Sequence, residues 1–139
     1  MKILKILPLV LSLFAAPLAH GHSDEYLDSQ PTPHGGQMRM AGAYHFELVA
    51  KANELTVYLT DHASTDVPSQ GASGTATVLA GKKKATVKLL PAGGNTLKGA
   101  GQFELAPDMK VVVSIALPGK ASEQARFTPR QKSAAEHQH

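Results

Sequence analysis

The sequence predicts an all-β fold, a small β-sandwich or barrel of about six to seven short, mainly antiparallel strands. From about residue 40 to 128, short segments alternate apolar and polar side chains with period two, which is typical of strands with one buried face. Turn residues such as those at 91–95 separate these segments at close spacing. No helical period persists after residue 21, so the pattern favours a sandwich or barrel over a helical fold.

The individual strands follow from this alternation. We expect strands at 44–50, 54–61, 75–80, 84–90, 96–105 and 110–117, and a short edge strand at 126–128. Gly99 and Gly101 lie inside the fifth segment and indicate a bulge or bend there.

The first hairpin has a register that can be predicted from its turn. If residues 52–53 form a two-residue turn, one face of the hairpin is almost wholly apolar, as a buried face requires. The pairs on that face are Ala50–Leu55, Leu48–Val57, Phe46–Leu59 and Tyr44–Asp61. His45, Glu47 and His62 then share the opposite face, which we expect to point to solvent.

The first 21 residues have the layout of a cleavable secretory signal peptide. A basic start at 1–5 precedes an apolar stretch at 6–18, which is too short for stable membrane insertion. Ala19 and Gly21 are small residues suited to cleavage, and cutting after Gly21 makes His22 the first residue; cutting after Ala19 is the alternative. These features predict an exported, periplasmic protein.

The rest of the chain divides into three parts. Residues 22–33 are polar with two prolines and are predicted to be a flexible leader, 34–128 form the β-domain, and 129–139 form a disordered tail. Without the signal peptide, the formal net charge falls from +3 to +1 because Lys2 and Lys5 are removed.

Composition excludes several kinds of chemistry. The chain has no Cys, so disulfides, thiolate metal sites and cysteine catalysis are excluded. Aromatic residues make up only 5% and Trp is absent, which together with export argues against nucleic-acid binding. No motif of an enzyme is present, and we do not expect the protein to be an enzyme.

A first candidate metal site lies in residues 33–40. Met38 and Met40 fall on one side of an extended chain, and two glycines after His34 let its ring fold toward them. Thioether and imidazole suit Cu(I) or Ag(I) without any thiol. The alternative is that the methionines fill the core.

Two further candidates involve histidine. His45 and His62, with Glu47 or Asp61 nearby, form an imidazole–carboxylate cluster suited to Cu(II) or Zn(II), unless they are merely exposed strand residues. His22 at a new amino terminus would chelate Cu(II) or Ni(II) through its amine and ring, unless it belongs to an unstructured leader.

Three stretches together suggest a family. They are His34-Gly35-Gly36, Gly42-x-Tyr44-His45-x-Glu47-Leu48-Val49 and Leu55-x-Val57-Tyr58-Leu59-x-Asp61. They resemble the small β-domain of some periplasmic adaptor subunits of heavy-metal resistance–nodulation–division (RND) efflux pumps, and stand-alone periplasmic proteins built on that domain. The likeness covers about residues 33–127, and the helical hairpin and lipoyl parts of an adaptor are missing. The resemblance implies a role in metal homeostasis, with His34, His45 and His62 as candidate positions.

Two functions remain open from the sequence. The first is a periplasmic heavy-metal protein, for copper above zinc, silver or nickel, that sequesters the ion or delivers it to an RND-type efflux system. The second is a structural or interaction module without metal that docks to a cell-envelope complex through a sheet edge.

The signal peptide gives the first testable prediction. We expect protein isolated from the periplasm to lack residues 1–19 or 1–21, because signal peptidase cuts after a small residue. Intact-mass spectrometry measures this directly, and a full-length mass in that fraction would show that no signal peptide is removed.

Overall fold

The computed structural model describes residues 23–129. The predicted signal peptide at 1–21, His22, and residues 130–139 of the predicted tail lie outside the described residues. Within them, no helix has the length and apolar character needed to cross a membrane.

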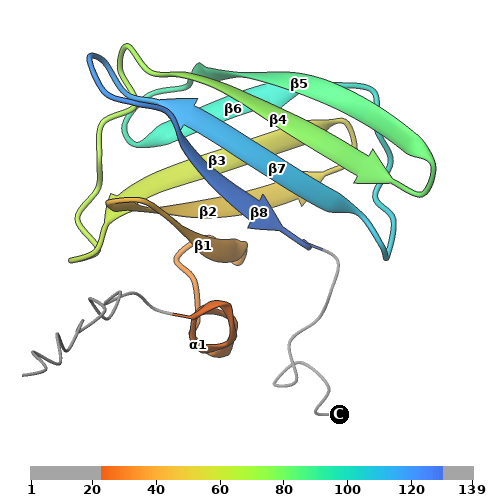
Figure 1. Ribbon diagram of the computed structural model, residues 1–139, viewed down its shortest axis with the longest axis horizontal. Helices are drawn as coiled ribbons and strands as arrows, with labels where there is room; N and C mark the ends of the chain where they lie inside the picture. The colour runs from red at the N-terminus through yellow and green to blue at the C-terminus, as the bar shows by residue number, and fades with distance from the viewer. Residues whose placement is uncertain (1–22, 130–139) are drawn as a thin grey trace, which may run out of the picture.

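In the described part of the chain, eight strands form one antiparallel sheet in the order β1-β2-β3-β6-β5-β4-β7-β8 (Figure 1). The strands are β1 (Gln37–Ala41), β2 (Tyr44–Lys51), β3 (Glu54–Asp61), β4 (Ser73–Ala80), β5 (Lys83–Pro91), β6 (Thr96–Ala100), β7 (Lys110–Ala116) and β8 (Glu123–Phe127). The predicted all-β class is confirmed, with somewhat more strands than the six or seven expected.

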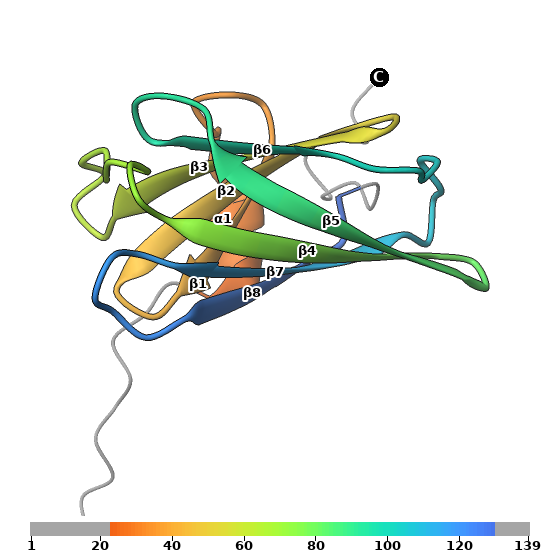
Figure 2. The same cartoon turned by 90° about the horizontal axis from the view of Figure 1, so that it is seen from above.

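The sheet curls into a nearly closed barrel. Its two edge strands, β1 and β8, come together at a seam (Figure 1). There the side chain of Gln37 takes the place of a backbone ladder: its Oε1 accepts from the Thr128 amide at 2.7 Å, and its Nε2 donates to the Thr128 carbonyl at 3.4 Å. Figure 2 shows the structure from above, with the β4–β5 hairpin extending beyond the end of the barrel.

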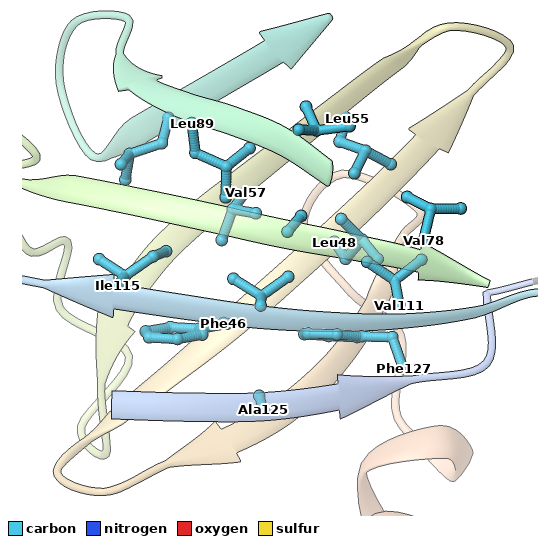
Figure 3. Packing of buried hydrophobic residues seen from close by; sticks show 14 of the residues in the cluster. Phe46, Leu48, Leu55, Val57, Val78, Leu89, Val111, Ile115, Ala125 and Phe127 are labelled. Carbon is cyan, nitrogen blue, oxygen red and sulfur yellow. The ribbon is translucent and has the colours of Figure 1, made fainter. Parts of the chain in front are cut away.

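The core lies inside this barrel. Every strand sends alternate side chains inward, as period two requires, and Figure 3 shows several of them meeting between the strands. The largest hydrophobic side chains with less than 2% exposure are Phe46, Phe127, Leu48, Leu55, Leu59, Leu89, Leu97 and Met109. This apolar interior stabilises a domain that has no disulfide.

The predicted register of the first hairpin is confirmed. All four pairs expected on its buried face occur between β2 and β3. On the opposite face, however, His45 is only 4% exposed and Glu47 only 2%, whereas His62 is exposed as expected. The expectation was wrong for His45 and Glu47 because another part of the chain covers them.

Residues 23–36 form this cover. Their turn at His34 and Gly36 contacts Glu47, and it follows a short helix, α1 (Asp24–Ser29), which lies outside the barrel below β1 in Figure 1. Ser23 caps it by accepting from the Tyr26 amide, and the Leu27 side chain is buried. A flexible leader was predicted for 22–33, so the helix corrects that prediction for Asp24–Ser29. The sequence signal was weak because a six-residue helix is too short to show a helical period.

One strand was missed, and two strand boundaries differ from prediction by three residues or more. No strand was predicted at 37–41, where β1 forms, and β8 starts three residues earlier than expected. The segment predicted to run to residue 105 ends as a strand at Ala100. Within it, Gly99 allows a close approach of β5, because a Cβ at Gly99 would lie 2.3 Å from the Lys88 carbonyl oxygen.

The core gives the second prediction. Phe46→Ala should lower the free energy of unfolding by about 3–5 kcal/mol, since it removes a buried ring and leaves a cavity. Urea denaturation followed by circular dichroism measures the change. Leu90→Ala is the control, because Leu90 is 53% exposed and its truncation should change stability by no more than about 0.5 kcal/mol. Equal effects of the two variants would contradict the assignment of the core.

Candidate functional site

The outer face of β1 and β2 gathers most of the side chains predicted to bind metal. In the antiparallel register, Met38 lies opposite Glu47 and Met40 lies opposite His45. Directly opposed residues point to the same side of a sheet, so these four side chains share one face. Tyr58 of β3 lies opposite Glu47 and extends the same face.

Residues 23–36, which comprise α1 and the turn that follows it, cross this face and are called the strap here. The guanidinium of Arg39, in β1, holds one end of the strap. Its Nη1 and Nη2 donate hydrogen bonds to the two Asp28 carboxylate oxygens at 2.8 and 3.3 Å. Arg39 Nε also lies 3.5 Å from Asp24. Such a two-bonded arginine–carboxylate pair fixes geometry as well as charge, so α1 is held against β1.

The other end of the strap is fastened by Glu47. Its Oε2 accepts from the amides of His34 and Gly36 at 3.0 and 2.9 Å, and its Oε1 lies 2.9 Å from His34 Nδ1. A Cβ at Gly36 would lie 2.4 Å from the Leu48 carbonyl oxygen, so only glycine lets the turn approach β2 this closely. A buried carboxylate needs such partners, and here the strap supplies them.

The His34 ring is held in one orientation. It stacks flat on Tyr58, with ring centroids 3.5 Å apart and planes 2° from parallel. Since a carboxylate accepts hydrogen bonds, Nδ1 is the protonated nitrogen next to Glu47. In the neutral ring Nε2 then carries the lone pair, and the His34 side chain is 40% exposed.

A second pair of histidines lies beside this arrangement. The rings of His45 and His62 meet edge to face with centroids 4.7 Å apart. His62 Nε2 lies 3.0 Å from the Gly42 carbonyl oxygen, which can only accept, so Nε2 carries the proton. The neutral His62 ring therefore has its lone pair on Nδ1.

A groove of about 340 Å³ lies between the strap and the sheet. Among the residues that line it are Leu27 and His34 from the strap and Met38, His45 and Glu47 from the sheet. The groove therefore combines a thioether and two imidazoles from three separate elements of the sequence.

The predicted site residues are only partly brought together. His34, Met38, His45 and Glu47 line the groove, whereas Met40 lies beside it opposite His45 and His62 contacts His45. The expected imidazole–carboxylate cluster is rearranged: Glu47 contacts His34, and the rings of His45 and His62 meet each other. Among residues 23–129, no three His, Asp or Glu side chains form a group placed to hold an ion.

Asp61 takes a different role from the one the sequence suggested, and Tyr58 joins the site without having been predicted there. Asp61 Oδ1 accepts from the Ala63 and Thr65 amides at 2.9 Å each and so shapes the loop after β3. Tyr58 was not singled out, although the predicted register already placed it opposite Glu47.

Comparisons with known proteins add no relative: no family model, curated protein or solved structure matches the chain.

The strap contacts give the third prediction. Glu47→Ala leaves two amides and the His34 ring without their acceptor, so we expect a loss of about 1–3 kcal/mol in the free energy of unfolding. Urea denaturation measures it. The control is Glu104→Ala, which removes an exposed carboxylate and should change stability by no more than about 0.5 kcal/mol. If the two variants are equally stable, Glu47 does not hold the strap in place.

Proposed function

We propose that this is an exported, periplasmic protein that binds a soft metal ion, Cu(I) in the first place, in the groove beneath the strap. It sequesters the ion or delivers it to an RND-type efflux system. The observation that carries the proposal is that Met38, His45 and His34 line one groove, although they come from two strands and the strap.

The donor types favour a soft ion. Thioether sulfur prefers Cu(I) and Ag(I), and imidazole accepts both soft and borderline ions. Met40 lies directly opposite His45 in the register, so a second thioether is adjacent. Methionine is unbranched and flexible, which lets its sulfur turn toward an ion that arrives in the groove.

The hydrogen bonds around the histidines support the same proposal. Histidines that bind metals characteristically donate their other ring nitrogen to a carboxylate or a backbone carbonyl, which fixes the ring and raises the basicity of the ligating nitrogen. His34 makes the first kind of contact with Glu47, and His62 makes the second with the Gly42 carbonyl. In this proposal Glu47 orients a ligand instead of being one.

The cellular role in the proposal rests on the sequence. The arrangement of residues 1–21 supports export, and the resemblance of residues 33–127 to adaptor β-domains supports a link to metal efflux. Sequestration and delivery both require reversible binding of the ion, so the binding measurement comes first.

The fourth prediction compares how Met38 and Met40 contribute to metal affinity. Met38→Leu should weaken Ag(I) or Cu(I) binding by about tenfold or more, and Met40→Leu should weaken it less, because Met38 lines the groove and Met40 lies beside it. Leucine conserves the volume of methionine, so folding is retained. Calorimetric titration with Ag(I), and anaerobic competition against a chromophoric chelator for Cu(I), measure the affinities.

The matched control is Met109→Leu. Met109 is 1% exposed in the core, so its sulfur should not affect the affinity. If the unmodified protein binds neither ion more tightly than roughly 10 μM, about 7 kcal/mol, the metal proposal fails and the interaction module takes its place. Equal losses for all three variants would also contradict a site at Met38.

A further inference from the structure

The strap closes over a face that an ion would have to reach. His45 is 4% exposed beneath it, and the His34 ring at the mouth of the groove is 40% exposed on its side chain. An ion arriving from solvent therefore meets His34 first, and a movement of the strap would widen its access to His45, which also lines the groove.

The fastening at Glu47 is suited to such a movement. Within the described residues, the hydrogen bonds that its carboxylate accepts all come from His34 and Gly36 of the strap. If the strap lifts, Glu47 loses these donors and gains access to water at the same time. The carboxylate thus has hydrogen-bond partners in both arrangements, the strap in the closed one and water in the open one, so the segment can adopt two states.

The second fastening lies farther toward the amino terminus. Arg39 and Asp28 hold α1 to β1 through two hydrogen bonds, and they do not contact Glu47. The turn carrying His34 can therefore detach from Glu47 while α1 stays in place. Residues 31–36, which follow α1 and include the two residues held by Glu47, are the segment that would move.

We propose that this segment is a lid on the metal groove, that Glu47 is its latch, and that His34 is the ligand which the lid brings to the ion. Glu47 is a positioning residue in this arrangement, because it acts through the His34 ring. The coupling to metal rests on the proposed function, whereas the latch itself does not. Ion binding and lid closure then favour each other, since the closed state alone supplies His34.

The latch is tested without metal. Amide hydrogen exchange at His34 and Gly36, measured by NMR on the purified, tag-free protein, reports how often the segment opens. Glu47→Gln removes the charge but keeps the size, and it should speed exchange at both amides by about tenfold, while both still exchange faster than the Val57 amide in the core, which exchanges through global unfolding. Glu54→Gln removes an exposed carboxylate of β3 and serves as the control. Unchanged exchange at both amides in Glu47→Gln would overturn the latch.

The lid is tested by adding silver nitrate to the same samples. Ag(I) should slow exchange at His34 and Gly36 about tenfold in the unmodified protein, because a bound ion holds the segment closed. His34→Ala keeps the backbone bonds to Glu47 but has no ring, so it should still bind Ag(I) through Met38 and His45 without slowing exchange.

The outcomes separate the two proposals. If Ag(I) binds but exchange at His34 and Gly36 stays the same, the lid is wrong and the metal site stands. If Ag(I) does not bind, the proposed function fails and with it the coupling, while the metal-free comparison still decides the latch. If His34→Ala shows the same slowing as the unmodified protein, His34 is not the ligand that couples them.

Discussion

Glu47 is a charged side chain at the middle of β2, and only 2% of the residue is exposed. A carboxylate in such a position is costly unless several donors satisfy it. The barrel cannot supply them, because the backbone groups of β2 are engaged with β1 and β3. The turn at His34 and Gly36 supplies them instead. The course of the strap, the orientation of His34 and the roof of the groove all depend on this one requirement.

The barrel fixes the other half of the arrangement. Its interior is built from apolar side chains of β2 to β8 and Ala41 of β1, so the residues that alternate with them on β1 and β2 point outward. Met38, Met40 and His45 are therefore on the outer face by the same constraint that buries Phe46. At the seam, a glutamine side chain from β1 joins β8 and keeps β1 in position. Met38, Met40 and His45 are consequently held in place by the core, whereas His34 is held by Glu47 and Tyr58.

The sequence was informative where the structure depends on neighbouring residues. Strict alternation and a two-residue turn were sufficient to predict the pairing of Phe46 with Leu59 and the common face of His45 and Glu47. What covers that face could not be predicted, because it depends on contacts between separate segments, such as Arg39 with Asp28. The short helix and β1 gain their stability from those contacts and carry little local signal. The burial of His45 follows from them.

The position of Glu47 also bears on which ions suit the groove. A borderline ion such as Zn(II) readily takes carboxylate oxygen, whereas a soft ion is satisfied by thioether and imidazole. Glu47 already accepts hydrogen bonds from His34 and Gly36, so an ion that took its oxygens would have to displace the strap. Hydrogen bonds to a charged group are worth about 1.5–3 kcal/mol each, and a soft ion leaves them intact. The carboxylate that holds the strap would thereby favour Cu(I) over Zn(II) without contacting either ion.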